Sequence, residues 1–211
     1  MANVLSPFGF TQVGTTGMPP NFARAGSGNP YRIAATWTTP IYKGDAVRMW
    51  VSGDGATASA GYLVTWIAAD GSAATKILVG IFQGCEYYST SQKRNVFSNF
   101  WPGGDASSDV KAYVVDDPDS EWMVQAGVVS VPFTQIYVGS TADVVVTPTG
   151  NALTGLSGMT LDTPTTTATF PFKVRNVITT PPTANGRDLL TAYNYVTVTL
   201  NNQQYGALLG V

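Results

Sequence analysis

The sequence predicts an all-β fold, an antiparallel β-sandwich or barrel with an extended N-terminal arm and little helix. Short segments rich in β-branched and aromatic residues follow one another along the chain, and Gly, Pro, Asp and Asn separate them. Few segments have the length or period of a crossover helix, so antiparallel pairing is favoured over a parallel sheet. The 211 residues are 44% hydrophobic, enough for one substantial core.

Residues 1–30 differ from the rest of the chain because they are rich in Gly and Pro and show no sustained period. This composition predicts an extended arm that cannot bury itself alone. A single β domain is expected over residues 31–211, since all-β folds of this length often form one domain.

The predicted strands of this domain are short and bounded by turn-forming residues. They cover residues 31–36, 41–50, 62–68, 76–82, 110–115, 121–127, 142–147, 168–178 and 193–200. In one of them, Phe172 and Val174 alternate with Lys173 and Arg175, so one face is expected in the core and the other in water. Pro171 places this strand at a sheet edge or a bulge.

The C-terminal part of the chain contains two segments that the pattern does not assign to strands. Residues 186–193 (GRDLLTAY) fit either one short helix or an ordered loop. The final residues are apolar, and Leu208, Leu209 and Val211 need a surface to cover them.

The charge of the chain is low. Only 11% of the residues are charged, against about 25% in an average soluble protein. With a pI near 4.9, the chain has no electrostatic reason to bind nucleic acid or an anionic membrane, and the adjacent Lys93 and Arg94 are too few for a nucleic-acid footprint. No apolar stretch approaches the length of a membrane span, and the N-terminus lacks a secretory signal pattern, so synthesis in a cytoplasm is expected.

The absence of histidine removes Ser-His-Asp and Cys-His catalysis and the common zinc sites. Ser157 lies in "GLSGM", which lacks the Gly two residues after Ser that a nucleophile elbow requires, so a turn is expected. Cys85 cannot form an intramolecular disulfide and is expected to be a small buried apolar residue. No catalytic residue, metal or cofactor is therefore predicted.

The stretch "VVDDPDSEW" concentrates acidic residues, namely Asp116, Asp117, Asp119 and Glu121. The last three match the first alternate ligand positions of an EF-hand loop, but the Gly required at the sixth position is a Trp and the closing Glu is a Val. Neighbours in a tight turn are also poorly placed to act as a glycosidase pair across a groove.

A turn accounts for more of this stretch than a site does. Asp caps turns with its side chain, and Pro118 presets the backbone angle φ. Alternating strands precede and follow it, so we expect a hairpin tip between residues 110–115 and 121–127.

A succession of short motifs resembles a family of virion structural proteins of tailed bacteriophages. The motifs are "MANVLSPFGF", "GIFQGCEY" with a following "FWPGG", "AYVVDDPDSEWMVQ", "TGLSGMTLD" and a terminal "GV". Members of this family are often regarded as capsid decoration or cement proteins. The resemblance spans nearly the whole chain and implies a non-enzymatic protein on the capsid exterior, assembled in the host cytoplasm, which clamps neighbouring major capsid subunits. No catalytic residues carry over.

Capsid contacts are expected at the apolar ends of the chain, because adhesion of this kind depends on apolar anchors. The expected contacts are Pro7, Phe8, Phe10, Leu208, Leu209 and Val211. The carboxylates of residues 116–121 are candidates for a charge contact between subunits. In an icosahedral shell such contacts would repeat about local symmetry axes, which favours a homo-oligomer, a trimer or dimer.

Three other functions remain open. A carbohydrate-binding head-fibre or tail module would use exposed aromatics at Trp37, Trp50, Trp66 and Trp101, although a core position is favoured for them. A major capsid shell subunit would, by resemblance to the usual shell proteins of tailed phages, need a long spine helix, which the sequence does not predict. An enzyme using the carboxylates of residues 116–121 is an outlier.

Overall fold

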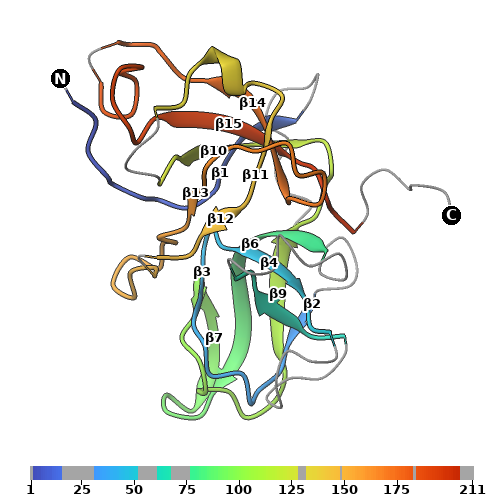
Figure 1. Cartoon of the computed structure of the whole chain (residues 1–211). Coiled ribbons are helices and arrows are strands. Elements are labelled where there is room, and N and C mark those ends of the chain that lie inside the picture. Colours follow the sequence, from blue (N-terminus) through green and yellow to red (C-terminus); the bar gives the residue numbers. More distant parts are fainter. Residues whose placement is uncertain are drawn as a thin grey trace, which may run out of the picture.

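The chain is nearly all β, with antiparallel sheets, as the sequence predicts (Figure 1). The computed structural model describes residues 2–15, 31–51, 61–67, 77–127, 132–147, 149–182 and 184–204. Within these ranges the helical structure is limited to one 3-10 turn, η1 (Gln135–Tyr137). The same residues contain no helix that is long and apolar enough to cross a membrane.

The first of two main sheets, here called the upper sheet, has five strands in the order β1-β10-β15-β14-β11. These strands are β1 (Thr11–Thr15), β10 (Ser120–Gln125), β15 (Tyr195–Leu200), β14 (Phe172–Val177) and β11 (Thr141–Ala142). As expected, Phe172 and Val174 of β14 are buried while Lys173 and Arg175 are exposed. Pro171 comes just before this strand, and a register shift interrupts β14 between Val174 and Asn176.

The second main sheet, the lower sheet, is built on the long strand β6. Its order is β2-β9-β6-β4-β5, and β7 pairs with the far half of β6. The strands are β2 (Tyr31–Ile33), β9 (Val110–Val115), β6 (Leu78–Ser89), β4 (Ala46–Met49), β5 (Leu63–Thr65) and β7 (Arg94–Ser98). Two small pairs complete the fold, β3 (Ile41–Tyr42) with β8 (Phe100–Trp101) and β12 (Val144–Val145) with β13 (Thr160–Leu161).

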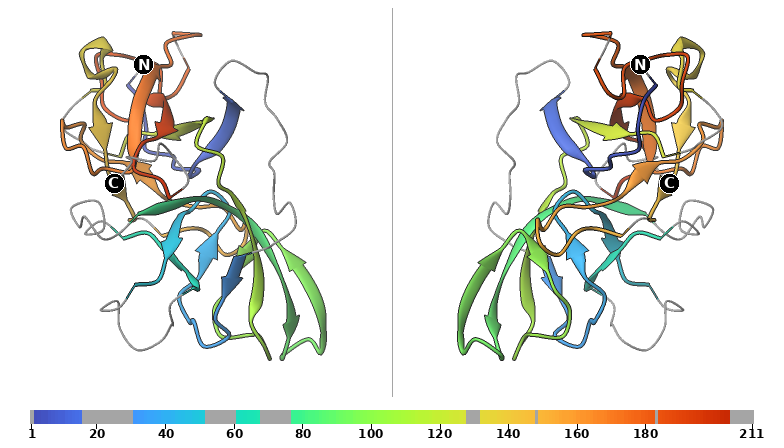
Figure 2. Two further views of the ribbon diagram at one scale, coloured as in Figure 1. Left: turned by 90° about the vertical axis from the view of Figure 1, so that its right-hand side faces the viewer. Right: turned by 90° about the vertical axis from the view of Figure 1, so that its left-hand side faces the viewer.

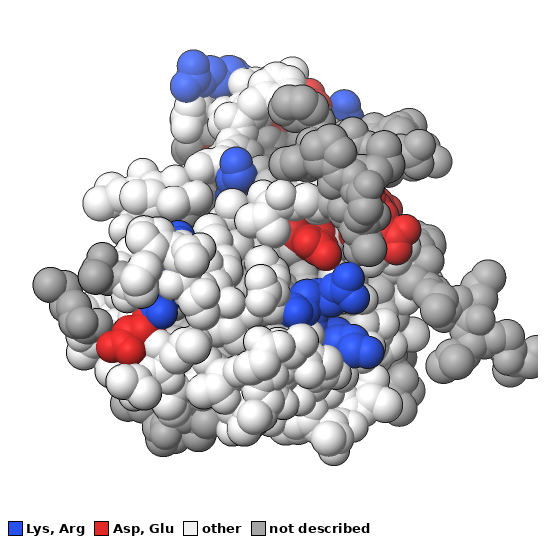
Figure 3. Space-filling view, turned by 90° about the horizontal axis from the view of Figure 1, so that it is seen from above, with Lys and Arg blue, Asp and Glu red and all other residues white. Residues whose placement is uncertain are grey.

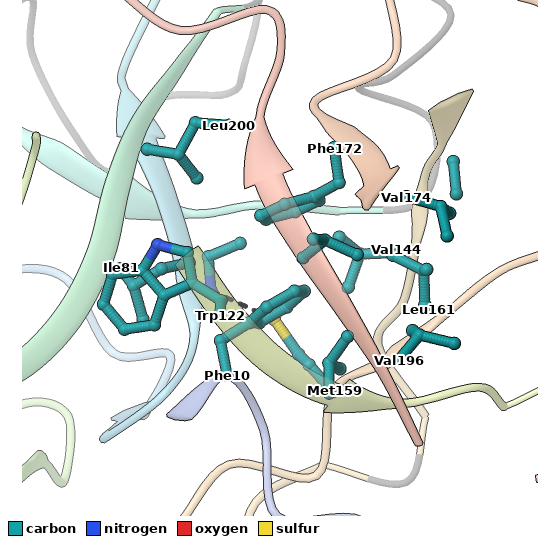
Figure 4. Packing of buried hydrophobic residues seen from close by; sticks show 14 of the residues in the cluster. Phe10, Ile81, Trp122, Val144, Met159, Leu161, Phe172, Val174, Val196 and Leu200 are labelled. Atoms are coloured by element: carbon teal, nitrogen blue, oxygen red, sulfur yellow. Dashed lines mark hydrogen bonds between the residues drawn. The ribbon is translucent and has the colours of Figure 1, made fainter. Parts of the chain in front are cut away.

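The two main sheets share a core (Figures 2 and 4). Ala46 and Ile81 from the lower sheet pack in one cluster with Trp122 and Phe172 from the upper sheet. A second cluster, which includes Trp101, lies within the lower half of the molecule. The lower sheet therefore contributes side chains to both clusters, and the two halves are held together by apolar packing.

The described part of the predicted arm, residues 2–15, lies along the body of the molecule (Figure 1). Strand β1 adds to the edge of the upper sheet by pairing with β10. Asn3 is buried and donates hydrogen bonds to the backbone oxygens of Asp188 and Ala192, each at 2.9 Å. The N-terminal segment is thus extended, as expected, and is integrated into the fold; residues 16–30 lie outside the described residues.

The prediction that β9 and β10 form a hairpin is wrong, although the turn between them is present. β9 pairs with β2 and β6 in the lower sheet, whereas β10 pairs with β1 and β15 in the upper sheet. The local sequence pattern of strand, turn and strand is the same in two cases. The second strand can fold back and pair with the first, or it can enter another sheet. The turn at residues 116–119 therefore connects the two sheets.

Candidate functional site

The acidic stretch forms hydrogen bonds that stabilise this connection. Asp117 Oδ1 accepts from the Asp119 N–H at 3.0 Å, and the Asp117 carbonyl accepts from the Ser120 N–H and hydroxyl. Asp116 Oδ2 accepts from the Tyr31 hydroxyl at 2.6 Å. Glu121 Oε1 lies 3.7 Å from Arg175 Nε. These contacts confirm the turn.

No cluster of three or more potential metal ligands occurs in the part of the chain that the structure describes. The carboxylates of residues 116–121 are instead engaged with neighbouring groups of the fold. Whether they also face another subunit stays a prediction.

The expected capsid anchors near the N-terminus differ in their accessibility. Phe10 is only 2% exposed and stacks on Phe172 with ring centroids 4.3 Å apart, so it belongs to the shared core and is not available as a surface anchor. Phe8 is half-buried and packs edge-on against Tyr195, and Pro7 is half-buried. The expected anchors Leu208, Leu209 and Val211 lie outside the described residues.

Four other apolar residues are exposed at the N-terminal end. Val4 is 64% exposed, Leu190 is 88% exposed, and Leu5 and Leu189 are partly exposed. We call these residues the N-terminal apolar surface.

Hydrogen bonds hold the two segments that carry this surface together. The Val4 N–H donates to Asn185 Oδ1 at 2.7 Å, and Asn185 Nδ2 donates back to the Val4 carbonyl at 3.1 Å. The buried Gln125 accepts from the Ser6 N–H and donates to the Val4 carbonyl. Residues 186–193 form an ordered loop, which resolves the choice between helix and loop.

The sequence does not indicate the N-terminal apolar surface, because the two halves of this surface are far apart in the chain. Its signals were the pair Val4-Leu5 in the arm and the pair Leu189-Leu190 in the loop. Each is too short to indicate a surface alone, and only the tertiary structure brings them to one end of the molecule.

The tryptophans proposed for glycan binding fall into two groups. Trp66 and Trp101 are fully buried, which confirms the core interpretation for them. Trp37 and Trp50 are half-buried, and the indole N–H of each has no hydrogen-bond partner among the described residues.

Trp37 lines a pocket of about 530 Å³. The walls come from the segment before and within β3, from β4 and β5, and from the segments around residues 146–150 and Met159. They include Tyr42, Arg48, Thr65 and Ile67. A pocket of this size, mostly apolar with a few polar groups, is typical of sites for small ligands.

Asp45 is a buried carboxyl group in the wall of this pocket. Its Oδ2 accepts from the Tyr42 N–H at 2.7 Å, and its carboxyl also accepts from the Ser157 hydroxyl. Burial raises the pKa of Asp45 to about 6 in spite of these hydrogen bonds. Ser157 Oγ also accepts from the Met159 N–H at 3.0 Å. Ser157 thus has a structural partner, and the chain offers no histidine to activate it.

Cys85 is buried, as expected, and its thiol donates to the Phe100 carbonyl at 3.4 Å. Burial raises the pKa of Cys85 to about 12. Because the thiolate is the reactive form, Cys85 is inert near neutral pH.

Comparisons with models of protein families, with curated proteins and with solved structures found no match.

Proposed function

We propose that this chain is a non-enzymatic virion structural protein that decorates and cements the icosahedral head of a tailed bacteriophage. It binds major capsid subunits on the capsid exterior in many copies. Two sequence features support the proposal: the succession of motifs along nearly the whole chain, and a charged content of 11%.

The N-terminal apolar surface is the structural feature that best supports this proposed function. Val4 and Leu190 project most of their surface into water, although burying a side chain of this size contributes roughly 1.5–3 kcal/mol. Hydrogen bonds to Asn3, Asn185 and Gln125 already fix the segments that present them. Docking therefore requires little further ordering of the chain, which favours tight binding.

The charge distribution is consistent with adhesion through shape and apolar contact. On the face seen in Figure 3, most of the visible described surface is uncharged, and the charged side chains form small groups. Glu121 lies near Arg175, and this proximity reduces the attraction of Glu121 for a distant partner. A surface with few charges is easily desolvated when it meets a capsid subunit.

A decoration protein is favoured over a major capsid shell subunit. The shell fold expected for tailed phages needs a long spine helix, and the described ranges hold no helical element beyond η1. The proposal is therefore that the chain binds on the outside of the shell; a homo-oligomer about a local symmetry axis is part of this proposal.

The proposal is tested by adding purified protein to heads made without it and measuring the bound fraction by sedimentation. Leu190→Asp introduces a charge into the N-terminal apolar surface, and we expect it to weaken binding by at least about tenfold, because a charge must then be desolvated on docking. Leu153→Asp is the matched control, since Leu153 is 97% exposed in another loop.

Both substitutions are at exposed positions, so neither is expected to affect folding. If the Leu190→Asp variant bound heads as well as the unmodified protein does, the N-terminal apolar surface would be excluded as the contact with the capsid. Failure of the unmodified protein to bind heads would exclude the proposed function itself.

A further inference from the structure

The pocket beside Trp37 has no part in the proposed attachment to the head. It lies among β3, β4 and β5, whereas the N-terminal apolar surface is formed by residues 4–5 and 189–190. Its wall is mainly apolar, with Pro40, Val64 and Val146 beside Trp37. Such a wall can pack against the apolar face of a ring.

Two lining residues carry buried polar atoms without a hydrogen-bond partner, Trp37 Nε1 and Thr65 Oγ1. An unpartnered buried polar atom costs roughly 1–3 kcal/mol, so such atoms are uncommon in folded proteins. Both residues are only half-buried. The two atoms are themselves buried, so pairing with a ligand in the cavity requires the Thr65 and Trp37 side chains to turn toward it. Both can donate, so a ligand with acceptor oxygens would satisfy them.

The charged groups in the wall are already engaged. Asp45 accepts from the Tyr42 N–H and the Ser157 hydroxyl, and Arg48 donates to the Met49 carbonyl at 3.2 Å. The two residues also have opposite formal charges. The pocket thus offers neutral donors to a ligand and no unbalanced charge, which favours an uncharged ligand.

We infer that this pocket binds a neutral saccharide of one or two rings. The C–H face of a sugar ring would pack on Trp37 and the neighbouring apolar wall. Its hydroxyl oxygens would accept from Trp37 Nε1 and Thr65 Oγ1. A cavity of about 530 Å³ lies within the range of roughly 300–1,000 Å³ found for small-ligand sites.

The test is an NMR titration of the five indole N–H resonances with glucose, galactose, N-acetylglucosamine and maltose at millimolar concentrations. Trp37→Phe assigns the Trp37 resonance by removing it. We expect at least one saccharide to shift the Trp37 resonance and to leave that of Trp50 in place. Trp50 is the matched control because it is also half-buried with an unpartnered N–H, but it does not line the pocket.

Variants then test the two donors. Trp37→Phe and Thr65→Val are each expected to weaken saccharide binding about tenfold, the effect of losing one hydrogen bond in a buried site. Trp50→Phe and Thr160→Val remove unpartnered groups from residues that do not line the pocket, so they should leave the affinity unchanged.

Three outcomes would overturn the inference: no response to any of the sugars, equal losses in the control variants, or a response to an apolar dye in place of the sugars. The last would indicate a pocket for an apolar segment of a partner protein. Leu190→Asp should retain saccharide binding, so failure at the pocket and failure of head attachment are distinguishable.

Discussion

Asp45 is a carboxyl group whose burial opposes its ionisation. Its pKa in the folded protein is about 6, above the ordinary value of 3.8 for an aspartate, so the unfolded chain releases this proton at lower pH than the folded chain does. The stabilising contribution of the protonated group is complete below pH 3.8 and is lost as the pH rises to about 6. A difference of about two pH units corresponds to roughly 3 kcal/mol.

Asp45→Asn is therefore expected to flatten the pH dependence of the unfolding free energy between pH 4 and about pH 6, because an amide does not ionise. Urea denaturation across this range measures the effect. Asp105→Asn serves as the control. Hydrogen bonds, led by that from the Ser89 hydroxyl, lower the pKa of Asp105 to about 2. The stability that the ionised Asp105 carboxylate contributes is therefore lost only below pH 3.8, outside the range in which Asp45 acts. An unchanged slope in Asp45→Asn would contradict this role of burial.

At the scale of elements, the turn at residues 116–119 directs the chain from the lower sheet into the upper one. Asp117→Ala removes the side-chain acceptor for the Asp119 N–H and is expected to cost about 1 kcal/mol. Asp117→Asn keeps an oxygen in that position and should retain most of the stability. Thermal denaturation compares the variants, and equal losses in both would show that the hydrogen bond is not the stabilising feature.

The sequence predicted most elements but not their partners. Alternation correctly assigned the buried face of β14, and β-branched runs located β9 and β15. β1 was missed because it lies in a segment rich in Gly and Pro, and it forms a strand only by pairing with β10. The prediction of a β9–β10 hairpin was wrong for a similar reason, since strand pairing depends on residues that are remote in the sequence.

The candidate sites were still harder to predict than the strands. The pocket beside Trp37 combines segments around residues 40, 65 and 146, and nothing in their local patterns indicates that they meet. Trp37 was singled out for its residue type alone. The buried pair of Asp45 and Ser157 also joins residues far apart in sequence, so neither its contact nor the raised pKa of Asp45 was foreseeable.

At the scale of the whole molecule, the N-terminal segment belongs to the core shared by the two sheets. Phe10→Ala is expected to destabilise the protein by about 3–5 kcal/mol, since it leaves a cavity beside Phe172. Phe97→Ala is the control, because Phe97 is 72% exposed and its loss should change stability by no more than about 0.5 kcal/mol. Chemical denaturation separates these outcomes, and a mild effect of Phe10→Ala would return this residue to the candidate capsid anchors.

We propose that the protein binds the outside of the head and stabilises it. The most direct measurement compares heads with and without the protein, by heating them and recording the temperature at which they release DNA, with labelling of the protein on intact heads. We predict that the protein is labelled on the outer surface and that heads lacking it release DNA at a lower temperature. Equal release temperatures, or absence of the protein from the head surface, would contradict the account.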